Sequence, residues 1–195
     1  IQASGRCVRG ERTHAFNESS TPWVAEMPSH LGAQQMHGGE RWLAISRGGV
    51  TMVSLHPPQA GHGAEAYQRI LDEVWVFLEE AERGRNVVIG LDANVCVQTD
   101  YTHIGEAVPR VVHSVLNAER ATALQRFLVS SQLLLVNTCA DPSGRLSTRT
   151  NWNGSGASQI DFLAVHLTRM VEEVAVDAAL DFSTDHRLVW CTVLN

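Results

Sequence analysis

Residues 87–95 read VVIGLDANV, and this stretch is the starting point for the fold. Its first five residues form an unbroken apolar run, which is typical of a buried strand. Asp92 and Asn94 follow the run directly, so a carboxylate and an amide stand at the end of a rigid element. The segments on either side of this strand determine which layered fold surrounds it.

Two helices are predicted around the strand. Residues 64–83, AEAYQRILDEVWVFLEEAER, carry apolar side chains at i, i+3, i+4 and i+7, and Gly84 suits the position just after a helix. Residues 117–131, NAERATALQRFLVSS, place Leu124, Phe127 and Leu128 on one face. Both segments therefore present an apolar face that can cover a sheet.

Six further segments have strand character: WLAIS (42–46), VTMVSLH (50–56), LLLVN (133–137), IDFLAV (160–165), VEEVAVD (171–177) and LVWCTVL (188–194). Gly48 and Gly49 separate the first two, and a Gly-Gly pair favours a hairpin. Strands and helices in this mixture predict an α/β layered fold. The Gly-, Ser- and Asn-rich residues 151–158 are its longest clear loop.

Residues 1–40 carry no sustained periodicity. Glycines and prolines are scattered among charged residues there, a composition typical of loops. We expect an irregular, unassigned segment over residues 1–40, followed by one folded region over residues 41–195.

The composition excludes several classes of protein. A chain of 195 residues with 44% apolar residues can bury a core without disulfide or metal staples. Its cysteines, Cys7, Cys96, Cys139 and Cys191, form no C-x-x-C pair, which indicates an intracellular setting, the nucleus being one option. No apolar run is long enough to span a membrane, and no secretory signal is recognisable. The net charge of -6 predicts local, metal-assisted contacts with phosphate rather than a basic binding surface.

Acidic, amide and histidine side chains recur at the ends of the predicted strands. They are His56, Asp92 with Asn94, Asp161, and Asp185 with His186. Hydrolysis of a phosphodiester requires carboxylates for a divalent cation, an oriented water, and donors for the charge that develops on the phosphoryl oxygens. These residue types supply all three requirements.

Each position also has a purely structural explanation. Asp and Asn commonly end strands through local backbone hydrogen bonds, and Asp185 with His186 would suit a solvated turn. A histidine before two prolines, such as His56, can simply end an edge strand. His62 fits a loop histidine better than a zinc ligand, because no clustered ligands accompany it. Asp161 lies in an apolar run, where an ionised carboxylate needs a partner such as His186.

Four motifs in their order and spacing resemble the endonuclease/exonuclease/phosphatase superfamily: SLHPP, GLDANV, SQIDFLAV and STDHRLV. Residues 117–138 and 150–162 are most similar to the endonuclease domains of non-LTR retroelements. The resemblance covers residues 42–195. It implies two packed mixed sheets flanked by helices, DNA as the substrate, and a reverse transcriptase domain further along the parent polypeptide.

The resemblance also implies a role for each matching residue. Asp92 would orient or deprotonate the attacking water, and Asn94 would donate a hydrogen bond to the phosphate. His186 would contact the scissile phosphate, with Asp161 fixing its tautomer. His56 would be a second phosphate contact.

The implied metal is Mg²⁺ or Mn²⁺, with Asp185 and Asp92 as ligands. The implied substrate contacts are Asn117, Arg120 and Trp152, in loops that flank the groove of the relatives. A tryptophan there would stack on a base.

One departure concerns the amino-terminal part of the domain. The family normally has an asparagine and then a glutamate on two earlier strands, and neither motif is recognisable here. Asn17 and Glu26 are superficially similar but only nine positions apart. Without that glutamate a magnesium ion would bind weakly. We also expect an unpaired sheet edge or a thinly covered apolar sheet face.

The sequence therefore favours a divalent-metal-dependent phosphodiester hydrolase of the endonuclease type. The alternative, motivated by the missing ligands, is an inactive remnant that binds nucleic acid or protein through the same groove. A phosphatase for small phosphoesters or inositol lipids is a third interpretation, and the retroelement-like segments speak against it.

Overall fold

The fold is described from a computed structural model. It describes residues 35–47, 49–80, 86–100, 102–108, 114–139, 147–151, 153–154, 156–169, 171–177 and 184–193. The predictions for Asn17, Glu26, Cys7, Gly84 and Trp152 lie outside these residues.

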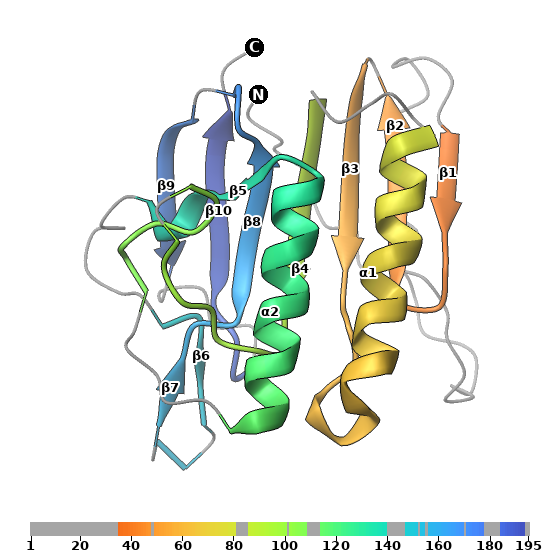
Figure 1. Cartoon of the computed structure of the whole chain (residues 1–195). Helices are drawn as coiled ribbons and strands as arrows, with labels where there is room; N and C mark the ends of the chain where they lie inside the picture. The colour runs from red at the N-terminus through yellow and green to blue at the C-terminus, as the bar shows by residue number, and fades with distance from the viewer. Residues whose placement is uncertain are drawn as a thin grey trace, which may run out of the picture.

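A six-stranded mixed sheet organises the molecule, with the strand order β1-β2-β3-β4-β8-β5 (Figure 1). The strands of this sheet are β1 (Gln35–Gly38), β2 (Trp42–Arg47), β3 (Val50–Leu55), β4 (Val87–Asp92), β5 (Leu133–Leu135) and β8 (Asp161–His166). β3 pairs with β4 in parallel, and the other neighbours are antiparallel. The central strand β4 is the apolar run from which the sequence argument began.

The hairpin predicted before the first helix is confirmed. β2 and β3 pair in antiparallel register, and Gly49 between them has φ of +77°. Glycine reaches this left-handed conformation without the steric cost that a side chain would impose. β1 was not predicted by the sequence pattern, because a four-residue strand at the edge of the sheet depends on its partner β2 rather than on its own alternation.

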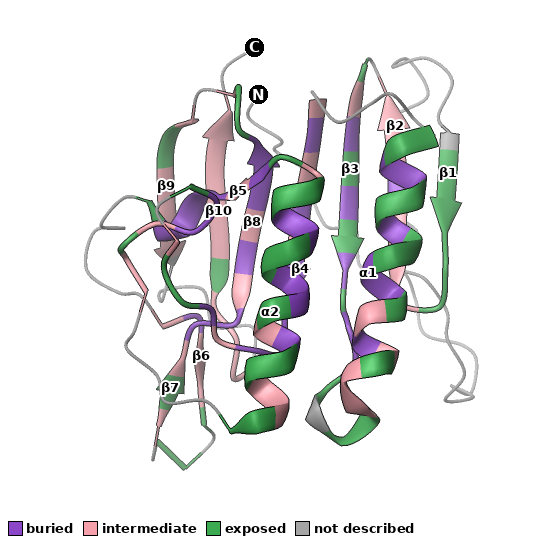
Figure 2. Cartoon of the chain, in the orientation of Figure 1, coloured by how far each residue is buried: buried purple, intermediate pink, exposed green. Residues whose placement is uncertain are grey.

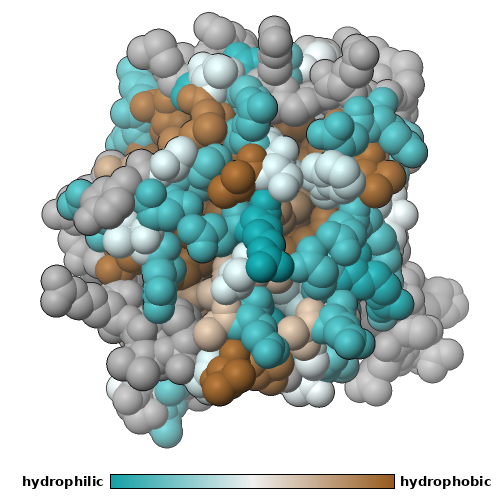
Figure 3. All heavy atoms as spheres, in the orientation of Figure 1, coloured by the Kyte–Doolittle hydropathy of each residue, from teal (hydrophilic) through white to brown (hydrophobic). Residues whose placement is uncertain are grey.

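Two helices cover one face of the sheet, α1 (Gly63–Glu80) and α2 (Val115–Ser130) (Figure 1). The stripe predicted for α1 is buried: Tyr67, Ile70, Leu71, Val74, Phe77 and Leu78. Each such side chain contributes about 1.5–3 kcal/mol when it leaves water. The Ser114 side chain caps α2 by accepting a hydrogen bond from the Asn117 amide. The outer surface of the two helices is exposed and largely hydrophilic (Figures 2 and 3).

Two smaller sheets complete the described part of the fold. β9 (Val171–Asp177) pairs with β10 (Leu188–Val193), as the sequence predicts for two closing strands. The predicted loop 151–158 is closed by a short ladder between β6 (Arg149–Thr150) and β7 (Ala157–Ser158). The predicted α/β fold, a mixed sheet with flanking helices, is confirmed.

The face of the large sheet opposite α1 is thinly covered near β1 to β3. Met36, Ile45 and Met52 are neighbours across these three strands, and the two methionines are 48% and 47% exposed. Alternation along β3 leaves Met52 outside while Thr51, Val53 and Leu55 are buried. This exposure agrees with the expectation of an incompletely covered apolar face.

None of the described helices is both long and apolar enough to cross a membrane.

Candidate active site

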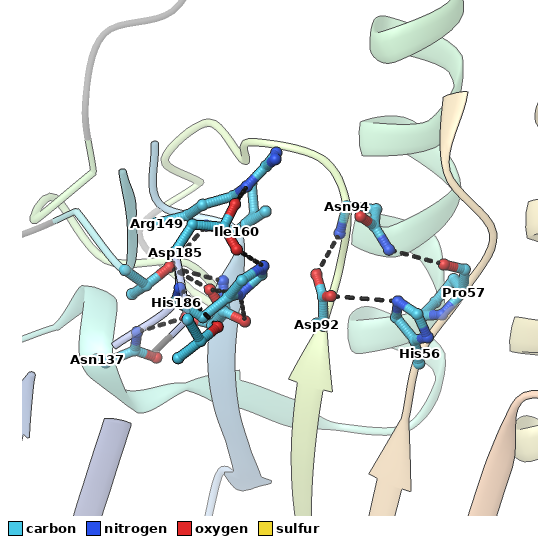
Figure 4. A network of polar contacts seen from close by, with 12 residues as sticks. His56, Pro57, Asp92, Asn94, Asn137, Arg149, Ile160, Asp185 and His186 are labelled. Carbon is cyan, nitrogen blue, oxygen red and sulfur yellow. Dashed lines mark hydrogen bonds and ion pairs between the residues drawn. The ribbon is translucent and has the colours of Figure 1, made fainter. Parts of the chain in front are cut away.

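The predicted site residues meet at one end of the large sheet. Asp92 is the last residue of β4, Asp161 is the first residue of the antiparallel strand β8, and the two are register partners. β3 runs parallel to β4 and ends at Leu55, so His56 emerges at the same edge. Strand direction alone therefore brings residues that are far apart in sequence to one place (Figure 4).

The first group is His56, Asp92 and Asn94, which we call the β4 half. The His56 Nε2 atom lies 3.2 Å from the Asp92 Oδ2 atom, and the backbone amide of Asn94 donates to the Asp92 Oδ1 atom over 3.2 Å. Asn94 has φ of +51°, a left-handed conformation that asparagine tolerates. Its side-chain amide donates to the Pro57 carbonyl over 3.0 Å and so joins the loop after β3 to the loop after β4.

The second group is Asp161, Asp185 and His186, which we call the β8 half. The His186 Nδ1 atom lies 2.9 Å and 3.1 Å from the two carboxylate oxygens of Asp161. An ionised carboxylate only accepts hydrogen bonds, so Nδ1 carries the hydrogen and donates it. The Nε2 atom of His186 remains available on the other side of the ring. The predicted pairing of Asp161 with His186 is present.

The Asp161 carboxyl is half-buried, and its pKa reflects two opposing effects. Burial raises the pKa above the usual range of an aspartate, while hydrogen bonds from Thr148 and His186 act to lower it. Burial has the larger effect, so the pKa is raised. The site therefore keeps a desolvated carboxylate beside the imidazole.

Asp185 lies beside His186, but its carboxylate is turned to Arg149. The Arg149 Nε atom donates to the Asp185 Oδ2 atom over 2.7 Å, and this hydrogen bond lowers the pKa of the Asp185 carboxyl. The other carboxylate oxygen is 3.8 Å from the His186 Nε2 atom, beyond hydrogen-bond length. The metal-ligand role expected for Asp185 stays a prediction.

Two residues that support the β8 half were not singled out from the sequence. The buried Thr148 hydroxyl donates to the Asp161 Oδ2 atom over 2.6 Å and accepts from the Asp161 amide over 2.9 Å. Asn137, also buried, donates to the Asp161 carbonyl and accepts from the Leu163 amide. The polar Asn137-Thr138 pair directly after an apolar strand was the available signal for the second residue. No local pattern indicated Thr148.

Asn117 and Arg120 lie in α2, as the helix predicted over residues 117–131 requires, so the loop position that the family resemblance implied for them is wrong. The polar stretch NAER continues the helical pattern once Ser114 caps the first turn. Arg120 is fully buried, and its Nη2 atom donates to the Pro58 carbonyl. Asn117, in the first turn, is partly exposed. A substrate contact by either residue stays a prediction.

Asp92, Asp161 and His186 form a group that could hold a cation, with one ligand atom from each, all within 4.8 Å of one another. Two oxygens that each lie about 2.1 Å from Mg²⁺ are at most about 4.2 Å apart, so a small inward movement would complete the contact. Two carboxylates and an imidazole suit Mn²⁺ better than Mg²⁺, which prefers oxygen ligands. The residues present therefore fit a divalent cation.

No family model and no curated protein matches the sequence. The structure, however, is similar to solved structures of the endonuclease/exonuclease/phosphatase fold. A 3′ phosphatase, NExo, from Neisseria bound to a product DNA hairpin is 18% identical with a TM-score of 0.62, over 82% of this chain and 71% of that chain.

Two further structures show how varied the proteins with this fold are. The endonuclease domain of TRAS1, a telomere-specific non-LTR retrotransposon, is 15% identical with a TM-score of 0.52, over 80% of this chain and 67% of that chain. A mannosyl-6-phosphatase from Bacteroides thetaiotaomicron is 17% identical with a TM-score of 0.51, over 79% of this chain and 56% of that chain. The chain thus has the endonuclease/exonuclease/phosphatase fold, and proteins of similar structure are nucleases and phosphatases.

Proposed function

We propose that this chain is a divalent-metal-dependent phosphodiester hydrolase of the endonuclease type, with DNA as its substrate. The observation that carries the proposal is the convergence of Asp92, Asp161 and His186 at one end of the sheet, with ligand atoms within 4.8 Å of one another. Structural turns or caps would not require a carboxylate pair and an imidazole from three different segments to face one another.

The β4 half is suited to the attacking water. The Asp92 carboxylate is 26% exposed and is held on one oxygen by the Asn94 amide and on the other by His56. A water bound to this carboxylate would lose a proton to it as the water oxygen attacks the phosphorus. The P–O bond to the leaving sugar oxygen would break in the same step, and that oxygen would take up a proton from solvent. The Asn94 side chain has a second amide hydrogen beyond the one given to Pro57, and it would donate to a phosphoryl oxygen.

The β8 half is suited to the phosphate itself. With Nδ1 bound to Asp161, the Nε2 atom of His186 is left to face a phosphoryl oxygen. A bound divalent cation, held by Asp92 and Asp161, would add charge stabilisation to the phosphoryl oxygens, and His186 would be a third ligand only when its Nε2 atom does not contact the phosphate. Arg149 holds the Asp185 Oδ2 atom, so Asp185 would join these ligands through its Oδ1 atom.

DNA is proposed over small phosphoesters on two grounds. Residues 117–138 and 150–162 resemble retroelement endonucleases, and the TRAS1 domain is among the similar structures. Trp152 and Asn117 remain candidate substrate residues within this proposal, whereas Arg120 is fully buried and would contact a substrate only if its side chain became exposed. A reverse transcriptase domain in the parent polypeptide and an intracellular, nuclear location also remain predictions.

The test is cleavage of supercoiled plasmid by the purified chain in millimolar Mg²⁺ or Mn²⁺. We expect faint nicking with Mg²⁺, stronger nicking with Mn²⁺ and none with EDTA, because two carboxylates and one imidazole make a weak site. Asp92→Ala should lower the rate by at least about 100-fold without loss of thermal stability.

The matched control is Asp72→Ala, which removes an exposed carboxylate of α1 away from the site and should leave cleavage unchanged. EDTA-resistant cleavage that persists in Asp92→Ala would refute the assignment. Duplex binding without cleavage under any metal would favour the inactive binding module, and faster release of phosphate from a small ester than from DNA would favour a phosphatase.

A further inference from the structure

Arg120 and Tyr67 form a buried pair where α1 and α2 meet. Both side chains are 0% exposed, and the Arg120 guanidinium carbon lies 4.6 Å from the centre of the Tyr67 ring. Such a cation over an aromatic face is stabilised by the ring quadrupole. The pair lies inside the helix layer, so neither residue is accessible to a substrate in this structure.

Each member of the pair holds one loop of the β4 half. The Tyr67 hydroxyl donates to the carbonyl of Ala93, the residue between Asp92 and Asn94, over 2.9 Å. The Arg120 Nη2 atom donates to the carbonyl of Pro58, two residues after His56. The loop after β4 is thus held by α1 and the loop after β3 by α2, through side chains that are distant in sequence from both loops.

The two anchored loops are also joined to each other above the pair. Asn94 donates to the Pro57 carbonyl over 3.0 Å, and His56 contacts Asp92 at 3.2 Å. The contacts therefore form a closed ring that runs through Arg120, Tyr67, the loop after β4 and the loop after β3. Loss of the hydrogen bond from Tyr67 or from Arg120 would let one loop move relative to the other.

The burial of Arg120 is costly for a residue that only fills the core. Its Nε and Nη1 atoms are buried and find no hydrogen-bond partner among the described residues. A buried charge with few partners costs free energy, and a well-packed apolar side chain of similar volume is often as stable or more so. Packing alone therefore gives no reason for a guanidinium at this position.

We infer that Arg120, together with Tyr67, is a positioning residue that sets the distance between His56 and Asp92 through the backbone of their loops. This inference deepens the proposed function, and only its kinetic part rests on that function. It differs from the substrate contact expected for Arg120, because the residue acts through the Pro58 carbonyl.

The experiment compares Arg120→Met, Arg120→Lys and Tyr67→Phe with Leu128→Ala in the full chain. Leu128 is buried on α2 two turns from Arg120 and belongs to the apolar core, so its truncation destabilises the fold without removing a loop contact. Backbone amide signals of Ala93 and Asn94 in NMR spectra report on the loop after β4, and those of Thr148 and His186 report on the β8 half.

For Arg120→Met and Tyr67→Phe we expect displaced or broadened signals from Ala93 and Asn94 and unmoved signals from Thr148 and His186. In the Mn²⁺ cleavage assay kcat should fall about 30-fold with KM nearly constant, since a misplaced water-activating carboxylate mainly affects the transition state. Arg120→Lys, which keeps a donor and a charge, should recover part of kcat.

Leu128→Ala should lower the melting temperature while leaving both sets of signals and kcat in place. The inference is overturned if Arg120→Met leaves the Ala93 and Asn94 signals unmoved, or if Leu128→Ala moves them equally. A wild-type chain without any cleavage would refute the proposed function, yet the NMR comparison would still decide the positioning role.

Discussion

The β4 half and the β8 half of the candidate site are built in different ways. In the β4 half the His56 and Asp92 side chains are 49% and 26% exposed, and a single contact joins them. In the β8 half the His186 and Asp161 side chains are 31% and 18% exposed, and His186 reaches both carboxylate oxygens. The pair of the β4 half is the more exposed of the two, and the β8 pair has the additional contact.

The supports of the two halves differ as well. The loops of the β4 half depend on distant side chains, Tyr67 and Arg120, from the helix layer. The β8 half is held by the side chains of Thr148 and Asn137 and also by backbone bonds close to the site, from the Thr150 amide to the Asp185 carbonyl and from the Arg187 amide to the Thr148 carbonyl. A half with many hydrogen bonds close to the site suits a fixed charge and a fixed imidazole, and the more exposed half suits an exchangeable water.

The largest effect is expected from Asp161→Asn, which tests whether the β8 half fixes the imidazole of His186. Asparagine cannot accept on both atoms that now face His186, so kcat for DNA cleavage in Mn²⁺ should fall about a thousandfold. The same substitution should also change how the free energy of unfolding depends on pH. Because burial raises the folded-state pKa of Asp161, stability from its bound proton is present below about pH 4 and is lost as pH rises through the higher folded value.

Asparagine does not titrate and has no such loss. The stability of Asp161→Asn relative to the wild type should therefore increase between pH 4 and pH 7. Urea unfolding at several pH values measures this difference. An opposite trend with pH would mean that His186 stabilises the ionised carboxylate more than burial destabilises it.

An intermediate effect is expected from Thr148→Val, which tests the rigidity of the β8 half. The change removes the hydroxyl that contacts Asp161 and leaves the buried Ile160 and Asp161 amides without their acceptor. The free energy of unfolding should fall by about 2 kcal/mol. Thr148→Ser keeps the hydroxyl and is the control. Equal stability of the valine and serine variants in urea unfolding would show that the hydroxyl network does not hold this half.

The smallest effect is expected from His56→Ala, which tests the contribution of the His56–Asp92 contact in the β4 half. His56 is half-exposed and follows the end of β3, so the free energy of unfolding should change by no more than about 0.5 kcal/mol. Loss of its contact with Asp92 should lower kcat about tenfold. His62→Ala, an exposed histidine six residues later, is the control and should have no effect. A stability loss as large as that of Thr148→Val would remove the distinction between the halves.

The sequence by itself determined most of the elements and the main residues of the candidate site. Unbroken apolar runs and i, i+3, i+4, i+7 spacing are local properties, so β4, β8, α1 and α2 could be predicted from the residues that form them. Asp92, Asp161 and His186 stood out because a polar group at the end of an apolar strand is visible in sequence.

Only the tertiary structure decided which residues support that site and which way they face. Arg120 is a polar residue outside the apolar face predicted for its helix, but α2 packs against α1 and turns the Arg120 side chain inward to the Pro58 carbonyl. Thr148 contacts Asp161, thirteen residues later, because the β6–β7 ladder folds one segment back on the other. Such contacts join segments with no shared local pattern, so their geometry follows from the packing of whole layers rather than from the residues at either end.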